Sequence, residues 1–415
     1  MLEGFKAQGS ALIEFKEAHG AHMACRSIHH PSPHLMTSKK VEETTSHIIW
    51  KNISMGWWER YIRTLSVGGA IVCLCIGCIV PVAFTGLLSQ LNDLASISPR
   101  LEWLKHIPGW SQGVLQGVLP PCLLSVVTIV LPITLERLIL EQGVHTDTSA
   151  ELLLQDYYFG FLFLQLFLVV SVSSSVAAVL GGLGQDFQSL AALIAQNLPK
   201  AGNYFFSYML LQGLSVSAAA LLQLTRLLNS LIAPLWDKTA RQKWERLREP
   251  EMKWGTLFPV YTNLAAIGLI YSIVSPLILL FNIATFGLFL AVQQYNVLNV
   301  SRSNTDTGGL IYPKAINQLF TGLYVMELYL VGLFILVRDE QNRPACIGQG
   351  VIMVLVLCFT LVYQRLLTHA YGPLFQRLPV MISESDRFGE PNHTSNRKAG
   401  PGANKFLCIL DRLED

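Results

Sequence analysis

The sequence predicts an all-α polytopic membrane protein, a bundle of helices that crosses the bilayer several times. Of its 415 residues, 51% are hydrophobic and only 14% are charged, and the mean hydropathy is +0.41. Soluble domains carry about 25% charged residues, so much of this chain must lie in lipid. The second observation is a series of apolar runs of about 20 residues, which is the length that a helix needs to cross the hydrocarbon core.

Eight apolar runs divide the chain into predicted membrane helices. They cover residues 65–91, 113–135, 159–183, 204–228, two helices that share 257–298 around Ser275-Pro276, 319–337 and 347–367. The predicted membrane domain is therefore 65–370, preceded by a pre-membrane segment at 41–64. The chain does not open on a basic start followed by an apolar core, so we expect the first run to act as the insertion signal.

Basic residues predict the orientation of the bundle, because Lys and Arg gather in short cytoplasmic loops. Segment 236–254 carries six of them and five more precede the first run, whereas loops 92–112 and 184–202 carry only three. We therefore expect both termini to be cytoplasmic. The protein itself is expected to lie in the plasma membrane or alternatively in an internal membrane. Segment 236–254 is also rich in Trp, and it either lies along anionic lipid or forms an ordinary solvated loop.

The two ends outside the membrane differ in character. Residues 11–15 are predicted to form a short strand and 17–28 a helix, as at the edge of a soluble α/β domain. The tail at 371–415 is cytosolic by the predicted topology, and its polar residues with Gly and Pro at 383–415 predict that it is largely disordered.

Several classes of function are excluded by composition. A net charge of +2 is too small for a nucleic-acid footprint, so no nucleic-acid partner is expected. The sequence contains no nucleophile elbow, phosphate-binding glycine loop or His/Cys metal spacing, so we predict no enzyme activity, no cofactor and no metal. Most of the eight cysteines lie in apolar runs, where they act as small hydrophobic residues.

Polar uncharged side chains gather in the third and fourth runs. On the fourth, four of them recur at steps of four, four and three, which places them on one helical face. This face could line a wet path; the alternative is that small residues let the helices approach closely. The candidate pore-lining residues are Gln165, Ser171 and Ser175 in the third run and Tyr204, Tyr208, Gln212 and Ser215 in the fourth.

A buried acid and several helix breakers complete the candidate residues. Glu327 lies well inside the seventh run, either as a group of the ion pathway or as an acid hydrogen-bonded to the fourth or eighth helix. Gly213, Pro81 and Pro121 are candidate gating hinges, because broken backbone at membrane depth is tolerated only where protein or a cavity surrounds it. The alternative is that these residues have no gating role, because Gly and Pro are common in membrane helices generally.

The order of short motifs resembles the calcium-permeable stress-gated (hyperosmolality-gated) cation channels in their fungal form. The resemblance covers about 9–378. It rests on Ile49-Trp50-Lys51-Asn52-Ile53, Trp57-Trp58-Glu59-Arg60, Pro81-Val82-Ala83-Phe84, Gly117-Val118-Leu119-Pro120-Pro121, Asn197-Leu198-Pro199-Lys200-Ala201, Leu211-Gln212-Gly213-Leu214-Ser215 and Pro259-Val260-Tyr261-Thr262-Asn263.

This resemblance implies an anoctamin-like fold with eleven membrane helices and an RNA-recognition-like cytosolic domain before the fourth. By that likeness 1–40 is a remnant of the cytosolic domain, and the eight runs are the last eight helices of an N-terminally truncated member. It also implies a pore formed within one subunit by the first to fifth runs, a gate on the fourth, and a homodimer.

The leading hypothesis is therefore a subunit of a mechanically or osmotically gated, calcium-permeable cation channel, with membrane lipids and permeant cations as partners. The predicted pore helices lack acids at depth, so any cation preference is expected to come from Ser, Gln and carbonyl oxygens or from acids at the mouths such as Asp93, Asp156 and Asp186. The alternatives are a lipid scramblase with a groove open to the bilayer, and an inactive or regulatory fragment.

Overall fold

The computed structural model describes most of the membrane domain and parts of both ends. The described residues are 10–15, 18–27, 31, 37–42, 47–53, 55–88, 119–173, 198–232, 239–247, 252–301, 307, 309–337, 346–376 and 406–411. Ser175, Asp93 and Asp186 lie outside them. The side chains of Pro81, Pro121, Ser171 and Tyr204 are also outside the description, although their backbones lie in helices.

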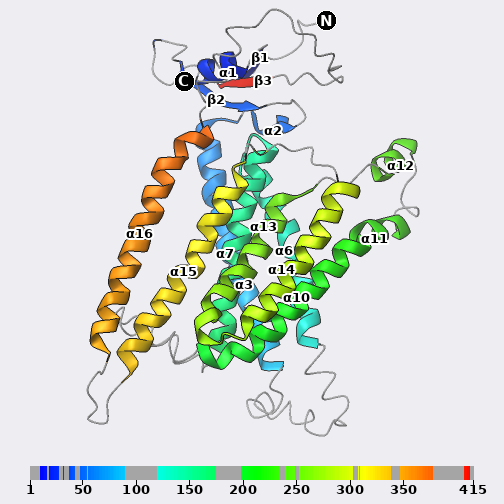
Figure 1. The fold of residues 1–415 in the computed structure, drawn as a ribbon. Coiled ribbons are helices and arrows are strands. Elements are labelled where there is room, and N and C mark those ends of the chain that lie inside the picture. Colours follow the sequence, from blue (N-terminus) through cyan, green and yellow to red (C-terminus); the bar gives the residue numbers. More distant parts are fainter. Residues whose placement is uncertain are drawn as a thin grey trace, which may run out of the picture.

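Long helices dominate the described chain (Figure 1). The main ones are α3 (Trp57–Leu88), α6 (Leu119–Glu141), α7 (Asp147–Ser173), α10 (Gly202–Leu222), α13 (Trp254–Val274), α14 (Ile278–Asn299), α15 (Ile311–Leu336) and α16 (Ile347–Gln376). Six of them, namely α3, α10, α13, α14, α15 and α16, are long and apolar enough within the described residues to cross a membrane. The prediction of an all-α polytopic membrane protein is confirmed. The second and third predicted runs overlap α6 and α7, which are not among those six.

One helix boundary was predicted from the sequence and another was not. Pro276 separates α13 from α14, because the residue before a proline is pushed out of the helical region, and Ser275 has φ −150° and ψ 87°. The fourth predicted run is divided into α10 and α11 (Leu224–Ile232) by Gln223, whose φ is +47°. The helix is unbroken through Gly213 and changes direction ten residues later.

The bundle contains two packed groups of helices. In one, buried side chains of α3, α6 and α7 such as Val67, Leu135 and Tyr158 form a core. In the other, α10, α13, α14 and α15 pack around residues such as Tyr271. Helices α7 and α13 join the two groups, and Val260 of α13 touches both cores.

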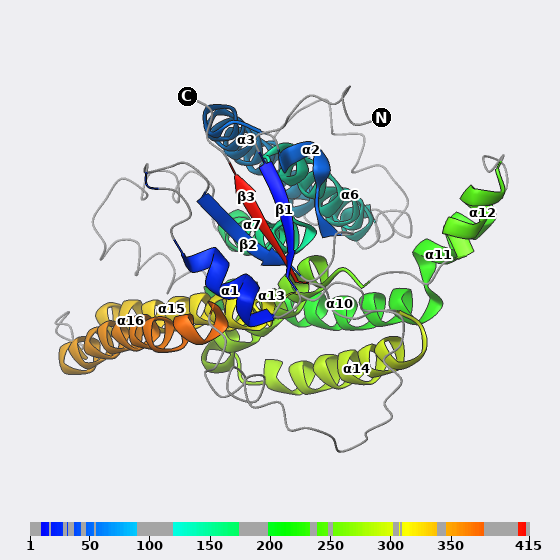
Figure 2. The same cartoon turned by 90° about the horizontal axis from the view of Figure 1, so that it is seen from above.

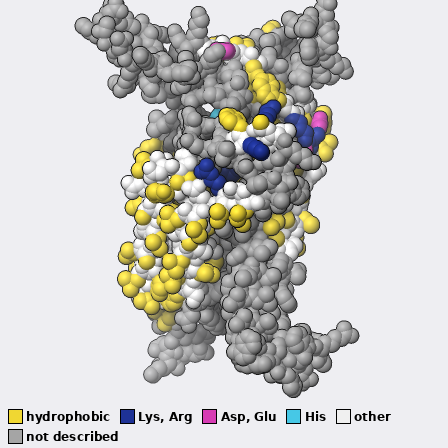
Figure 3. Space-filling view, turned by 90° about the vertical axis from the view of Figure 1, so that its right-hand side faces the viewer, with side chains coloured by type: hydrophobic (Ala, Val, Ile, Leu, Met, Phe, Trp, Pro, Cys, Tyr) yellow, Lys and Arg dark blue, Asp and Glu magenta, His cyan; other side chains and the backbone are white. Residues whose placement is uncertain are grey.

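Helix α16 lies at the margin of the bundle, where it packs against α15 (Figure 2). Large apolar side chains on its surface, such as Leu355 and Phe359, are well exposed in the protein alone. Apolar exposure along helices of this length fits a lipid solvent. Figure 3 shows hydrophobic side chains spread over the described face of the bundle, with Lys and Arg gathered nearer one end.

A small sheet lies at that end, which we call the sheet end of the bundle (Figure 1). It consists of β1 (Ser10–Phe15), β3 (Phe406–Asp411) and β2 (Thr37–Glu42) in that order, with β3 antiparallel to both neighbours. Helix α1 (Ala18–Arg26) packs beside the sheet, and its residue range is close to that of the helix predicted at 17–28. Within the tail predicted to be largely disordered, Phe406–Asp411 is instead the central strand. The polar composition of the tail as a whole hid this short apolar run from the prediction. The backbone of the run hydrogen-bonds to two strands that are far away in the sequence.

Candidate functional site

The predicted polar face of the fourth run lies on α10. Tyr208 and Gln212 are half-buried and Ser215 is exposed, with the Ser215 hydroxyl donating to the Gln212 carbonyl oxygen at 3.5 Å. Gly213 is buried at the contact with α14, where an added Cβ would lie 2.8 Å from Thr285 Oγ1. Close packing of α10 on α14 therefore explains the glycine.

The third and fourth predicted runs have different main neighbours in the described structure. Helix α7 packs chiefly against α13, α3 and α6, whereas α10 packs chiefly against α14. Gln165 of α7 is buried, with 8% of its surface exposed. The short 3-10 helix η3 (Leu198–Ala201) touches both α7 and α10. The helices that carry the two predicted polar faces are thus packed chiefly against different neighbours in the described residues.

A glycine on α13 explains why this helix lies so close to α7. A Cβ at Gly255 would lie only 2.6 Å from the carbonyl oxygen of Glu151. Small residues allow backbones in membrane bundles to approach in this way.

A buried polar network joins α7, α13 and α15 near the sheet end. Gln155 Nε2 donates to the Ile311 carbonyl oxygen at 3.2 Å, Gln318 Nε2 donates to the Gln155 carbonyl oxygen at 3.2 Å, and Thr262 Oγ1 donates to Gln318 Oε1 at 2.8 Å. Beside it, Lys314 pairs with Asp156. Asp156, which the sequence suggested as a mouth acid, is thus engaged by a lysine on α15.

Glu327 lies between α15 and α16, with 3% of its surface exposed. Its Oε1 accepts a hydrogen bond from Thr360 Oγ1 at 2.7 Å, and Oε2 has no hydrogen-bond partner in the described residues. Tyr324 donates to Gln364, whose Nε2 donates to Asn317 Oδ1 at 3.1 Å. The structure therefore has the second of the two arrangements considered for Glu327, an acid bonded to the eighth predicted helix.

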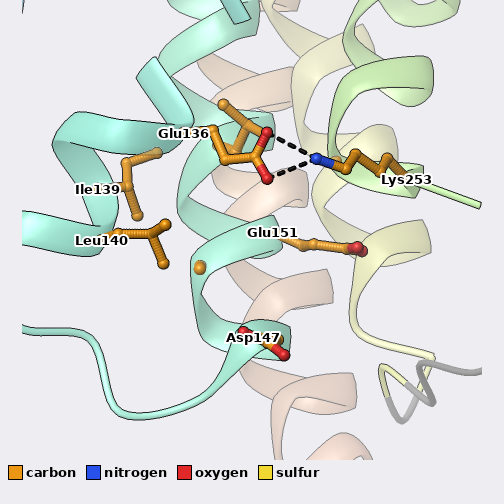
Figure 4. A pocket seen from close by; sticks show the side chains of 9 residues that line it. Glu136, Ile139, Leu140, Asp147, Glu151 and Lys253 are labelled. Atoms are coloured by element: carbon orange, nitrogen blue, oxygen red, sulfur yellow. Dashed lines mark hydrogen bonds and ion pairs between the residues drawn. The ribbon is translucent and has the colours of Figure 1, made fainter. Parts of the chain in front are cut away.

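A cavity of about 120 Å³ opens at the sheet end between α6, α7 and α13 (Figure 4). Lys253, directly before α13, donates to both carboxylate oxygens of Glu136 on α6 at 2.5 and 2.7 Å. Glu151 of α7 lies beside this ion pair, and Asp147 lies one turn earlier on α7 (Figure 4). The cavity thus brings three carboxyl groups and one ammonium group together.

Glu151 has the most unusual environment of these groups. It is partly buried, and its Oε2 has no hydrogen-bond partner in the described residues. The pKa of the Glu151 carboxyl is raised to about 7, chiefly by burial and to a smaller extent by the charges of Asp147 and Glu136, while nearby Lys253 and the Gly255 backbone amide act in the opposite direction. A carboxyl with this pKa changes charge near neutral pH.

The pre-membrane segment is fixed to the turn between α6 and α7. Helix α2 (Trp50–Ile53) contains Asn52, which is 1% exposed and donates from Nδ2 to the carbonyl oxygens of Leu140 at 3.0 Å and Val144 at 2.8 Å. Lys51 and Arg63 both pair with Glu141 at 2.9 and 3.4 Å. His47 Nδ1 lies 3.8 Å from Asp147, a residue that also lines the cavity.

Comparison with known proteins identifies the family. Residues 63–334 match the RSN1_7TM model, described as the calcium-dependent channel 7TM region, and this match covers more than half of the chain. The chain belongs to this family. The RSN1_7TM region begins in α3 and ends in α15, so it contains the cavity residues Glu136, Glu151 and Lys253, whereas Asn52 and Thr360 lie outside it.

Similar proteins come from fungi and plants. The chain is 36% identical to "Uncharacterized protein RSN1" and 31% identical to "Phosphate metabolism protein 7", both of Saccharomyces cerevisiae; these matches cover 89% and 88% of this chain but 38% and 36% of the relatives. It is 25% identical to "Hyperosmolality-gated Ca2+ permeable channel 1.6" of Arabidopsis thaliana, over 92% of this chain and 50% of that protein. The chain therefore spans about half, or less, of these relatives.

Sequence reasoning found some parts of the site and missed others. The motifs of the resemblance include Asn52, and Glu136 is recognisable as an acid at the end of an apolar run. Neither pattern reveals which residue these side chains contact. Contacts such as Asn52 to Val144, 92 residues apart, depend on how the helices pack. Glu151 carried no signal, because it is one of several acids in a polar stretch before an apolar run.

Proposed function

We propose that this chain is a subunit of a calcium-permeable cation channel that opens in response to mechanical or osmotic stress, with the ion path inside one subunit. The observation that carries the proposal is membership of the calcium-dependent channel family over α3 to α15. A relative named for hyperosmolality gating and Ca2+ permeation supports the stimulus and the ion. Because the chain spans about half of that relative, conduction by this chain is part of the proposal.

The ion path in this proposal runs among α3, α6, α7, α10 and α13. Buried polar groups on these helices support it, because such groups are costly in lipid unless they meet partners or water. Gln165 of α7 and Ser217 of α10 are both buried, and the Ser217 hydroxyl has no partner in the described residues. Gln212 of α10 is half-buried. These groups could coordinate a hydrated cation without a carboxylate at depth.

The moving element in this proposal is the α10–α11 arm. Tension can shift an equilibrium only if two states differ in how they engage lipid. Leu214, Leu222 and Leu231 of this arm are 53%, 65% and 67% exposed, so its movement would change lipid contact. Gln223, with φ +47°, is a natural bending point, because a left-handed conformation is strained for a residue other than glycine.

Patch-clamp recording of the protein reconstituted in liposomes tests the proposal. Suction should evoke a current that carries Ca2+, and Gln212→Ala should reduce the unitary conductance. Gly287→Ala on α14 is the matched control, since a Cβ there would meet nothing within 4 Å. Gln223→Gly should shift the pressure threshold relative to Gln223→Ala, because glycine removes the strain of the state in which this residue has φ +47°.

The same liposomes separate the alternatives. Transfer of fluorescent lipid between leaflets without current would favour a scramblase. Absence of both activities, with the full-length yeast RSN1 conducting under the same conditions, would show that this chain alone is an inactive or regulatory fragment. Silence of the full-length relative as well would refute stretch gating.

A further inference from the structure

We propose that the cavity between α6, α7 and α13 is a proton-binding site, in which the charge of Glu151 controls the Glu136–Lys253 link between α6 and α13. The effect on current rests on the proposed channel function, whereas proton binding itself does not.

The geometry provides a carboxyl group that is ready to exchange a proton. The cavity has room for water, at about 120 Å³, and Glu151 is one of its lining residues. Glu151 Oε2 is buried and has no hydrogen-bond partner in the described residues. A neutral carboxyl places a proton on one oxygen, so water in the cavity is a suitable partner for this atom.

The charged groups that face Glu151 come from three elements. Lys253 precedes α13, Glu136 is on α6, and Asp147 is on α7 itself, where it also meets His47 of the pre-membrane segment. The Gly255 backbone amide also hydrogen-bonds to the Glu151 carboxyl. Lys253 is therefore the one ammonium that contacts the cavity in the described residues, and three carboxyl groups surround it.

The charge of Glu151 decides how Lys253 is shared. When Glu151 is neutral, Lys253 is attracted mainly to Glu136, as in the structure. When Glu151 releases its proton to cavity water, a second carboxylate competes for the same ammonium and also repels Glu136. Burial raises the pKa of Glu151 to about 7, so this exchange falls in the range of cytoplasmic pH.

The Glu136–Lys253 ion pair is largely exposed, and its importance comes from the two helices that it joins. Helices α6 and α13 both pack against α7, and the ion pair joins them across the cavity mouth (Figure 4). The turn after α6 carries the hydrogen bonds to Asn52 from the pre-membrane segment. Weakening this link would loosen α6 and its turn from α13, and both helices belong to the proposed ion path.

Infrared difference spectroscopy of the purified protein tests proton binding without any need for conduction. The band of a protonated carboxyl should disappear as the pH rises through about 7, and Glu151→Gln should abolish this change. Glu136→Gln should move the titration to lower pH and Lys253→Met to higher pH, each by about one unit, because one removes a negative and the other a positive neighbour. Glu59→Gln, an exposed carboxylate on α3, is the matched control and should leave the titration unchanged.

Hydrogen exchange and current test the consequence. Amides of 136–146 should exchange faster in the parent protein than in Glu151→Gln at pH 8, and equally at pH 6. In a conducting preparation the pressure threshold should depend on pH in the parent and not in Glu151→Gln.

Two results would overturn the inference in different ways, and a third would bear on the channel function alone. No carboxyl titration near pH 7, or the same titration in Glu151→Gln, would reject the proton site. A normal titration with identical exchange in both proteins would reject control of the link. A protein that titrates and exchanges as expected but never conducts would confirm the site and reject the proposed channel function instead.

Discussion

Asn52 donates a hydrogen bond from Nδ2 to the carbonyl oxygen of Val144 at 2.8 Å, across 92 residues of sequence. The same amide group also reaches Leu140 at 3.0 Å. Together with the bridge between Ile48 and Thr146, these bonds fix the pre-membrane segment to the α6–α7 turn. The pre-membrane segment and the α6–α7 turn are therefore coupled, and the turn lies beside the cavity that contains Glu151.

Replacement of Asn52 should reveal the strength of this joint. Asn52→Leu leaves two carbonyl oxygens without their donor in a buried position, and we expect a loss of about 2 kcal/mol. Thermal unfolding in detergent measures it. Lys51→Ala is the control, because its ion pair with Glu141 is exposed and contributes little to stability. Equal losses from the two variants would mean that the buried amide has no special role.

Gly213→Ala should destabilise the bundle. The new Cβ would lie 2.8 Å from Thr285 Oγ1 and 2.9 Å from its Cγ2, so α10 and α14 must separate slightly. Overpacking of this kind costs about 1–3 kcal/mol. Gly287→Ala, which meets nothing within 4 Å, should be neutral or stabilising by up to about 1 kcal/mol. If Gly213→Ala alters the pressure threshold without loss of thermal stability, Gly213 acts as a hinge rather than as a packing residue.

Thr360→Val should weaken the attachment of α16 to α15. It keeps the shape of the side chain but removes the hydroxyl that donates to Glu327 Oε1. Neither oxygen of the Glu327 carboxyl group then has a hydrogen-bond partner in the described residues. The free energy of unfolding should fall by about 1–3 kcal/mol. The double variant Glu327→Gln with Thr360→Val should lose no more stability than the two single variants added together. Limited proteolysis between α15 and α16 provides the measurement, and unchanged cleavage would show that this bond does not hold the pair.

The stability of the protein should depend on pH through Glu151. Its pKa is about 7 in the folded protein and 4.5 for an ordinary glutamate, so the folded state binds the proton more tightly. Its contribution to stability is therefore complete below about pH 4.5, falls as the pH rises to about 7, and is constant above that. The difference in unfolding temperature between Glu151→Gln and the parent should grow from pH 5 to pH 7.5. A constant difference across that range would contradict the pKa assignment.

Glu141 does not interfere with this experiment. Hydrogen bonding and attraction to Lys51 lower the pKa of Glu141 below its usual 4.5. Its contribution to stability is therefore present above about pH 4.5 and is lost only as the pH falls below that value. The two carboxyl groups act in separate pH windows.

The sequence alone was sufficient for the class of fold, the family and most helix positions. Apolar runs of membrane length are a local property of the chain, and proline acts on its own neighbours, so the break at Ser275-Pro276 could be predicted. The break at Gln223 could not, because nothing in the residue type requires a positive φ. Strand β3 was also missed, since its backbone partners are distant in the chain, as in the pairing of Ser10 with Asp411.

The candidate site shows the same division. Polar residues at helical spacing were visible in the sequence, but only the packing shows that α13 approaches α7 at Gly255 and that α10 lies against α14 at Gly213. Likewise, the sequence provided Glu136, Glu151 and Lys253 as three unrelated charges. Only the tertiary structure decided that they share one cavity, because charge and burial act through distance in space, and helix packing sets that distance.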